Sequence, residues 1–232
     1  MEERGVEFGL AKNHVQRQTS EKTFYFHNGV WRILMPLDPV LSSIRMCDGG
    51  DAPAFAEHFA RNFATSGKDG TPIFSVYSRR REVNIPHKIV RAKESWARPT
   101  SQIGWERSWA AFESAKNGDV QIVGEVTLLT SRQVETQLHR AMLGMGVEPG
   151  YRHRGIGKAL LGAALAWAEQ QMFLEWIDLG VFSENAAARA LYRSFSFIET
   201  GRTVDSFRVD GHKLDDIQMT LNLRCHVKSL KE

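Results

Sequence analysis

Hydrophobic residues recur with two different periods along the chain, and each period predicts a different kind of element. In residues 51–66 three phenylalanines follow one another at intervals of four, which predicts an amphipathic helix with one face toward a core. Asp51 is placed to cap the start of this helix, and Gly67 to end it. A second helical pattern covers residues 155–172 and puts these apolar side chains on one face: Ile156, Leu160, Leu161, Ala164, Leu165, Ala168 and Met172.

Runs of alternating or β-branched residues predict strands. The clearest turn between two such runs is Asn28-Gly29, which predicts a hairpin over residues 24–34. Residues 71–108 have a weaker pattern, in which a helix is indicated around 88–97. Further strands are predicted at 43–46, 109–115, 120–129, 138–147 and 176–182 and near the C-terminus around a turn at Asp210-Gly211, with a short helix at 185–195.

The predicted strands 138–147 and 176–182 are joined by the helix at 155–172. Two strands joined through a helix need a crossover connection, which favours parallel pairing, whereas the hairpins are antiparallel. The sequence therefore predicts an α/β (α+β) fold in which helices flank a mixed, mostly antiparallel central sheet.

Length and charge narrow the functional classes. The 232 residues suffice for one domain with a sizeable core and an appendage. Thirty basic and 27 acidic residues leave a formal charge of +3, which does not favour nucleic-acid binding. The acidic start has no apolar stretch behind it, so we expect no signal peptide or membrane segment and a soluble, cytoplasmic protein. Cys47 and Cys225 lie far apart, so neither a disulfide framework nor a metal site is expected.

The loop between the strand at 138–147 and its helix has the composition of an anion site. It contains Arg152-x-x-Gly155-x-Gly157, and the first turn of a helix offers unpaired N–H groups and a positive dipole end. Glycines let a pyrophosphate approach the backbone, and the basic residues beside them add charge. A Rossmann site would need Gly-x-Gly-x-x-Gly directly after the strand, and a Walker site would need Gly-Lys-Ser/Thr. Neither pattern is present in the sequence.

At these residues the chain resembles the GNAT superfamily of acyl-coenzyme A-dependent N-acetyltransferases. The family signature Arg/Gln-x-x-Gly-x-Gly/Ala is met by residues 152–157. The segment 176–201, WIDLGVFSENAAARALYRSFSFIETG, is similar to the family's fifth strand, Asn-headed helix and sixth strand. The two matches stand in the family's order, with the expected types of element between them.

The resemblance implies that two neighbouring strands splay apart and that the pantetheine arm of acetyl-coenzyme A lies in the gap, paired with a strand edge. The loop 152–157 would then bind the pyrophosphate. Residues implied in cofactor binding are Met145, Gly146, Val147, Arg152, His153, Arg154, Gly155, Ile156, Gly157, Lys158, Asn185 and Tyr192.

Catalytic roles follow from the same resemblance. Tyr192 matches a family tyrosine that can act as a general acid near the sulfur, although it also suits core packing. Asn185 can reach the pantetheine or simply cap its helix. Many relatives carry a glutamate on the fourth strand, where this chain has Met142. The identity of the general base therefore remains open. The candidates are Glu125, Glu148, a water chain and, less favoured, His139 at the start of the strand.

These residues predict an acetyl-coenzyme A-dependent N-acetyltransferase acting on a primary amine: a small amine, an amino acid or a protein N-terminus. The acceptor site would use residues 51–97 and 200–213, where the arginines 79–81 either bind a carboxylate or form a solvated basic turn. The alternative is a non-catalytic acyl-coenzyme A sensor. No nucleic-acid or membrane partner is expected, and a homodimer is compatible with the sequence. The predicted domains are an N-terminal extension, the acetyltransferase domain and a tail, at residues 1–42, 43–223 and 224–232.

Overall fold

A computed structural model describes most of the chain, and contacts divide it into two compact units, residues 1–42 and 43–232. The described residues are 7–10, 14–18, 23–27, 30–34, 39–77, 82–114, 119–130 and 134–224. Several predicted features lie outside these ranges: the turn residues Asn28 and Gly29, the arginines 79–81, the turn residues 116–118, and the end of the tail with Cys225.

The first unit contains a small antiparallel sheet. Its strands pair in the order β1-β2-β3-β4, and His27 lies opposite Val30, so that β3 and β4 form the pair that the sequence predicts. The elements are β1 (Glu7–Leu10), β2 (His14–Gln18), β3 (Thr23–His27), β4 (Val30–Leu34) and the short helix α1 (Pro39–Ser42).

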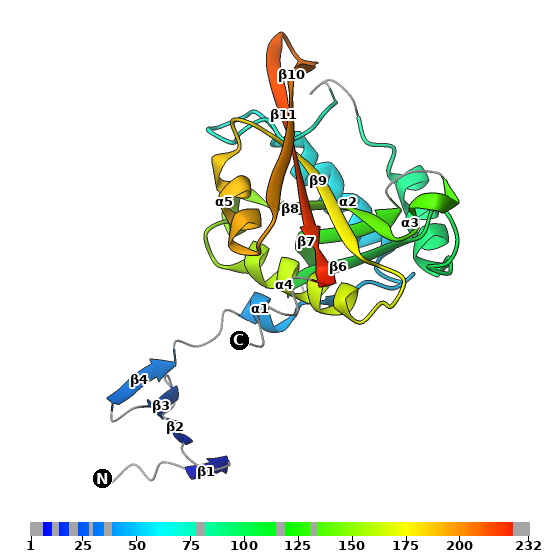
Figure 1. Cartoon of the computed structure of the whole chain (residues 1–232). Helices are drawn as coiled ribbons and strands as arrows, with labels where there is room; N and C mark the ends of the chain where they lie inside the picture. The colour runs from blue at the N-terminus through cyan, green and yellow to red at the C-terminus, as the bar shows by residue number, and fades with distance from the viewer. Residues whose placement is uncertain are drawn as a thin grey trace. The chain divides into compact units, whose positions relative to one another are not determined.

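The second unit is built on a seven-stranded sheet in the order β10-β11-β9-β8-β7-β6-β5 (Figure 1). Only β8 and β9 are parallel, which confirms the predicted mixed, mostly antiparallel sheet. Its strands are β5 (Arg45–Met46), β6 (Glu106–Ser114), β7 (Val120–Thr130), β8 (Arg140–Val147), β9 (Trp176–Phe182), β10 (Ile198–Val209) and β11 (His212–Asn222). The helices are α2 (Ala52–Ala64), α3 (Ile85–Ala97), α4 (Ile156–Glu169) and α5 (Ala186–Ser194), with single turns at Glu135–Gln137 and Pro149–Tyr151.

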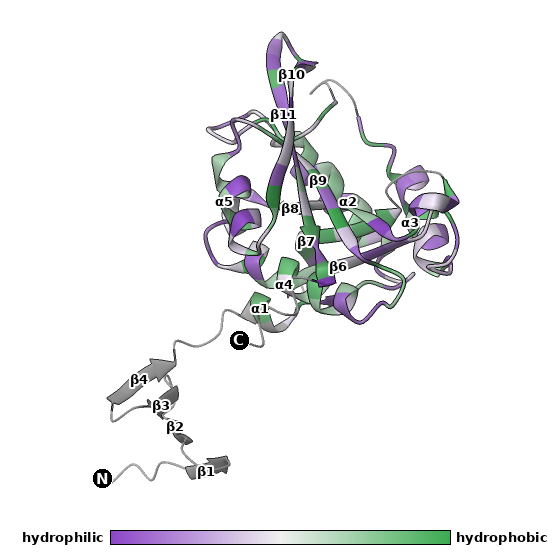
Figure 2. Cartoon of the chain, viewed as in Figure 1, coloured by the Kyte–Doolittle hydropathy of each residue, from purple (hydrophilic) through white to green (hydrophobic). Residues whose placement is uncertain are grey.

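Helices cover both faces of this sheet. Because side chains alternate along a strand, Ala110 and Phe112 of β6 face α2 and α3, with which they form one core cluster. Trp109 points to the opposite face, where its ring lies 5.5 Å from that of Trp167 on α4. Figure 2 shows how hydropathy differs between the elements: α4 and β7 are largely hydrophobic, whereas α3 and α5 carry many hydrophilic residues.

The helix predicted at 155–172 ends at Glu169, three residues early. Six of its predicted core residues are buried, but Met172 is 86% exposed, so its assignment to the core face is wrong. The chain leaves the helix through the bond from the Leu174 N–H to the Gln171 carbonyl, and Leu174, fully buried, occupies the core at this end instead. A periodicity count cannot detect this turn because Met172 still fits the period.

One predicted helix cap and two predicted element starts differ from the structure, for identifiable reasons. Asp51 occupies the N-cap position of α2, but its carboxylate binds Arg45 and the Asp48 N–H rather than capping the helix. Helix α3 begins three residues before 88, because the Asn84 side chain accepts a bond from the His87 N–H. Strand β6 begins at residue 106, before the predicted 109, because its first inward residues are polar and hide the alternation.

The end of α5 contains a strained serine. Ser196 has a φ of 65°, in the left-handed region that favours glycine, and its N–H donates to the Arg193 carbonyl. The Phe197 N–H donates to the Tyr192 carbonyl, and the two rings lie 5.8 Å apart. This pair of bonds with its hydrophobic contact is a Schellman motif, in which the left-handed position favours glycine.

We predict that Ser196→Gly stabilises the protein. The left-handed conformation of a residue other than glycine destabilises the folded state by about 1–2 kcal/mol. Glycine avoids this cost, but its greater freedom in the unfolded chain offsets about 0.5–1 kcal/mol of the gain. The expected gain is about 0.5–1 kcal/mol, or a rise in Tm of roughly 1–4 °C for a chain of this size. Thermal unfolding by circular dichroism measures it. Ser194→Gly, in the last helical turn, should lower Tm, and a Tm for Ser196→Gly at or below that of the parent would contradict the strain.

Candidate active site

The parallel strands β8 and β9 pair at only three positions, from Arg140 opposite Trp176 to Met142 opposite Asp178. Beyond Met142 each strand continues, paired on its other side with β7 or β11. At the closed end, the Arg140 guanidinium donates to both Asp178 oxygens, at 2.7 and 2.6 Å. The second half of β8 therefore has a backbone edge that faces a gap in the sheet.

The direction of the β8 backbone groups follows from one contact. The Val147 carbonyl accepts a bond from Arg152 Nε at 2.9 Å, so it points away from β7. Since backbone groups on one side of a strand recur every second residue, the N–H and C=O of Met145 also point away from β7, into the gap. Residues 145–147, predicted to pair with pantetheine, thus present an edge at which an extended amide chain can bind.

The phosphate loop, residues 152–157, leads into an open helix start. The first helical bond runs from the Ala159 N–H to the Gly155 carbonyl, and no side chain caps this end of α4. The N–H groups of residues 156–158 are therefore directed at the mouth of the loop. Glycine is required at 155 by its φ of 81°, whereas a Cβ on Gly157 would lie 3.4 Å from Met145 Cε.

The basic residues of the loop have different roles. Arg152 is half-buried, its guanidinium donates to Val147 O and to Thr71 Oγ1, and burial lowers its pKa. It holds the shape of the loop. His153, Arg154 and Lys158 are exposed, with the Arg154 guanidinium 5.0 Å from the centre of the Tyr151 ring. Arg154 and Lys158 are exposed cations close to the helix start.

Helix α5 lies beside this loop and carries the predicted tyrosine. Leu191 Cδ2 lies 3.5 Å from the Cβ position of Gly157, which brings α5 to the start of α4. Tyr192 is 6% exposed, and within the described residues its hydroxyl has no hydrogen-bond partner. Burial, and then the charge of Glu125, raises the pKa of Tyr192. The phenol therefore stays protonated and available as a donor at neutral pH.

Asn185 has the capping role that the sequence left open. Its side-chain oxygen accepts a bond from the Ala188 N–H at 3.2 Å, at the N-terminus of α5. Within the described part of the chain its amide nitrogen has no partner. A cap formed by the oxygen leaves the nitrogen able to donate to a ligand carbonyl, so the two predicted roles are compatible.

Glu125 is buried on β7, opposite Gly146 of β8. One carboxylate oxygen, Oε2, accepts a bond from the Thr127 hydroxyl at 3.1 Å. The other, Oε1, lies 3.7 Å from the position that a Cβ on Gly146 would occupy. Burial raises the pKa of Glu125, and the charges of His58 and Lys88 partly offset this effect. These features place a carboxylate of raised proton affinity at the edge of the gap.

Glu148 has a different environment. Its Oε1 accepts bonds from His58 Nδ1 at 2.9 Å and from Arg61 Nε at 3.0 Å. Burial acts to raise the pKa of Glu148, but the bonds and charges of these two residues outweigh it and leave the pKa lowered. A carboxylate held ionised between two partners is a weak base. Of the two predicted glutamates, only Glu125 has the setting of a base.

Two polar residues of α2 were missed by the sequence reasoning. His58 is fully buried, and its Nε2 has no partner among the residues that the structure describes, while its Nδ1 binds Glu148. Asn62, four residues on, has an Oδ1 without a partner in the same described part of the chain, and its amide lies where a side chain on Gly146 would stand. Their spacing places both on the buried face of the predicted helix, which was the available signal. A glycine at 146 is required by this close approach.

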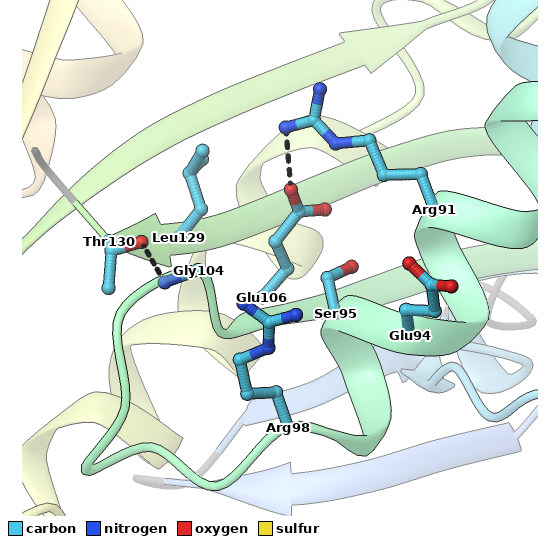
Figure 3. A pocket seen from close by; sticks show the side chains of 8 residues that line it. All are labelled: Arg91, Glu94, Ser95, Arg98, Gly104, Glu106, Leu129 and Thr130. Atoms are coloured by element: carbon cyan, nitrogen blue, oxygen red, sulfur yellow. Dashed lines mark hydrogen bonds and ion pairs between the residues drawn. The ribbon is translucent and has the colours of Figure 1, made fainter. Parts of the chain in front are cut away.

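A polar cavity lies farther along the same face of the sheet (Figure 3). Its volume is about 350 Å³, and Arg91 donates across it to Glu106 at 3.0 Å. Glu106 is four residues from Ala110, the strand partner of Glu125, or about 13 Å along β6. The cavity is therefore distinct from the gap. Its lining residues are Arg91, Glu94, Ser95, Arg98, Gly104, Glu106, Leu129 and Thr130.

Neither a membrane-spanning helix nor a metal-binding cluster is present among the residues that the structure describes. No helix among them is long and apolar enough to cross a membrane. Nor does that part of the chain contain a group of three or more His, Cys, Asp or Glu side chains that could hold a metal ion.

A mixed sheet that splays at its parallel pair, with an open helix start beside the gap, defines the acyl-coenzyme A N-acyltransferase fold. Solved structures share it. An acetyltransferase of the GNAT family from Streptococcus pneumoniae matches with a TM-score of 0.64 at 21% identity, over 77% of this chain and 98% of its own. The ribosomal-protein-alanine N-acetyltransferase of Brucella melitensis has a TM-score of 0.59 at 22% identity, over 77% and 98%. The Salmonella typhimurium protein yncA, solved with its cofactor acetyl-CoA, has a TM-score of 0.60 at 20% identity, over 78% and 92%.

The family model described as Acetyltransferase (GNAT) family matches residues 73–197, more than half of the chain. The protein therefore belongs to the GNAT acetyltransferase family, whose members are acyltransferase enzymes. A curated relative, the N-alpha-acetyltransferase RimI of Mycobacterium tuberculosis, is 40% identical over 67 residues. This segment is 29% of the chain and 40% of the relative, so the chain spans less than half of that relative's length.

We predict that Gly157→Val weakens coenzyme A binding and leaves the fold intact. The added methyl groups enter the space between the first turn of α4, Met145 and Leu191, where the family resemblance predicts that the coenzyme binds. Titration calorimetry should show a loss of at least about tenfold in affinity, or about 1.4 kcal/mol. Gly162→Val is the matched control because it places the same side chain in the same helix, away from the loop. Equal affinities of the two variants would argue against this site.

Proposed function

We propose that the protein is an acetyl-CoA-dependent N-acetyltransferase that transfers an acetyl group to a primary amine by direct attack on the thioester. The observation that carries the proposal is the arrangement around the gap. A strand edge and an uncapped helix start lie along it, Glu125 is buried at its β8 side, and Tyr192 lies on the adjacent α5. Each feature has a place in acyl transfer from a coenzyme thioester.

The chain's own groups suit acetyl-CoA. Residues 156–158 offer N–H groups to the pyrophosphate, and Arg154 and Lys158 add positive charge. The backbone of Met145 and Val147 offers bonds to the amides of the pantetheine arm, and Asn185 offers an amide N–H from the other side. When bound, the coenzyme supplies an activated acetyl group and a thiolate leaving group.

In the proposed reaction Glu125 is the general base and Tyr192 stabilises the leaving group. The amine nitrogen forms a bond to the thioester carbon while Glu125 takes its proton, and the C–S bond breaks with its electron pair on sulfur. The pKa of a thiol is about 8.5. It lies below the raised pKa of Tyr192. The phenol is thus better suited to donate a hydrogen bond to the thiolate than to give up its proton.

The acceptor is proposed to reach the gap over the face of the sheet that carries Glu125. On this face β8 and β9 expose glycines, and a Cβ on Gly144 would meet nothing within 4 Å. Asp216 Oδ1 lies 2.9 Å from the Cβ position of Gly180. An open sheet surface at the glycines, next to the acidic side chain of Asp216, suits a cationic amine. Because RimI is named an N-alpha-acetyltransferase and the Brucella protein a ribosomal-protein-alanine N-acetyltransferase, we propose N-terminal peptides as the first acceptors to test.

Binding and transfer can be measured separately. We predict that millimolar acetyl-CoA raises Tm, because a ligand that binds only the folded state adds RT ln(1 + [L]/Kd), about 2.7 kcal/mol at a hundredfold excess over Kd. Mass spectrometry should then detect acetylation in a panel of N-terminal peptides, amino acids and polyamines. Stabilisation with no acetylated product across the panel would favour the sensor, and no stabilisation would contradict both functions.

We predict different losses for the two catalytic substitutions. Glu125→Gln removes the base and should lower kcat by about 10²–10⁴-fold. Tyr192→Phe removes one hydrogen bond to a developing charge and should lower kcat by about 10–10²-fold, with little change in coenzyme affinity. Steady-state kinetics with the best acceptor tests both. Tyr77→Phe, an exposed tyrosine, is the control for the ring change. A kcat within twofold of the parent for either site variant would remove that residue from the mechanism.

A further inference from the structure

Three buried side chains form a chain of hydrogen bonds that ends on Glu125. The Trp96 indole nitrogen donates to Ser108 Oγ at 3.0 Å, Ser108 Oγ lies 2.8 Å from Thr127 Oγ1, and Thr127 donates to Glu125 Oε2 at 3.1 Å. Exposure of the three side chains is between 1 and 9%, so water does not compete for these bonds. We name Trp96, Ser108 and Thr127 the donor chain.

The direction of the donor chain is fixed at both ends. An indole nitrogen can only donate, so Ser108 accepts from Trp96 and directs its own hydrogen elsewhere. Thr127 has one hydrogen and gives it to the carboxylate, so it accepts the hydrogen of Ser108. All three hydrogens therefore point toward Glu125, an arrangement that favours the ionised carboxylate and in which each bond polarises the next.

Sheet register brings these residues together. Ser108 lies directly opposite Thr127 in the β6–β7 pair, and Glu125 is two residues from Thr127 and so on the same face. Helix α3 packs on β6 and places the Trp96 indole within hydrogen-bond distance of Ser108. Because the bonds come from three different elements, they also restrain the rotation of the Glu125 side chain.

The two oxygens of Glu125 are thereby made different. Oε2 is held by Thr127, whereas Oε1 faces Gly146 at the edge of the gap and has no hydrogen-bond partner within the described residues. The donor chain is uncharged, unlike most of the other groups that face Glu125. Those groups are His58 of α2, Lys88 of α3, Glu106 of β6, Tyr192 of α5 and the buried thiol of Cys47 after β5.

We propose that Trp96, Ser108 and Thr127 are positioning residues that hold Oε2 of an ionised Glu125 and leave Oε1 as the atom that takes the proton of the attacking amine. This inference rests on the proposed function, in which Glu125 is the base. The N–H bond of the amine breaks, its proton goes to Oε1, and the electron pair of the broken C–S bond leaves on the coenzyme sulfur. The donor chain itself gains and loses no proton.

The test is Thr127→Val, which keeps the side-chain shape and removes the donor. Loss of a bond to the charged form makes ionisation harder, so the pKa of Glu125 rises and the base is deprotonated only at higher pH. The acid limb of the kcat/KM profile should move upward by about one pH unit, the size expected for a hydrogen bond to a charged group. Below the limb the variant should be about tenfold slower, and well above it the rates should converge.

The Glu125 titration is also measured without any acceptor. Carbon-13 NMR of protein labelled at the glutamate carboxyl carbon follows it directly, and the signal that disappears in Glu125→Gln assigns it. Thr127→Ser restores the hydroxyl and should restore the parental titration. Ser108→Ala and Trp96→Phe should give smaller upward shifts, since they remove donors farther from the carboxylate. Thr220→Val is the matched control, because Thr220 is also buried and donates to a carboxylate, that of Asp178, at 2.7 Å.

The outcomes separate this proposal from the proposed function. If neither Thr127→Val nor Ser108→Ala moves the Glu125 signal beyond the shift in Thr220→Val, the donor chain has no role and the proposal is overturned. The same conclusion follows if Thr127→Ser fails to restore the titration. If the signal moves as expected but Glu125→Gln keeps full activity, the donor chain tunes a carboxylate that is not the base, and the proposed role of Glu125 fails instead. Should Thr127→Val not fold, Ser108→Ala supplies the same measurement.

Discussion

The parallel pairing of β8 and β9 stops after three positions, and the backbone beyond it must find partners elsewhere. The protein meets this demand only in part. Arg152 satisfies the Val147 carbonyl, while the peptide groups of Met145 still face the gap. Unpaired backbone at a sheet edge can pair with another extended chain, and the proposed coenzyme site rests on this property of the splay. The ion pair of Arg140 with Asp178 keeps the opposite end of the strands together.

Two helices, α4 and α5, lie next to the gap and can contribute groups to the proposed reaction. Helix α4 starts at one end of the gap without a side-chain cap, in a geometry suited to an anion, and α5 packs against that start through Leu191. The Schellman motif then fixes the position of Tyr192, whose carbonyl and ring are both held by Phe197. The strained φ of Ser196 is part of this arrangement, since the turn that binds the tyrosine requires a left-handed residue.

Glu125 is the costliest residue of the site to bury. A carboxylate removed from water needs compensating charges and hydrogen bonds, and here it receives them from His58, Lys88 and Thr127. The compensation is incomplete, because burial still raises the pKa of Glu125. That imbalance suits the proposed role of Glu125, because a general base needs a proton affinity close to the working pH. Glu148, with two close partners and a lowered pKa, shows the opposite outcome on the same side of the molecule.

The sequence by itself determined the elements whose signals are local. The loop at 152–157, strand β9 and the buried face of α4 follow from glycine positions and from periods of two and 3.6 residues, which depend only on neighbours along the chain. The candidate ligand residues 145–147 and Tyr192 came from the family resemblance of the same segments. The exposure of Met172 was missed because a helix ends where tertiary contacts end it.

Only the tertiary structure distinguished the environments of Glu125 and Glu148, on which the proposed choice of base rests, and only it revealed His58, Asn62 and the donor chain. These assignments depend on strand register, on the packing of α2 and α3 over the sheet, and on where two strands part. Each of these is set by contacts between residues tens of positions apart. A sequence read along its length contains the residue types but not their distances, and proton affinity depends on distance and burial.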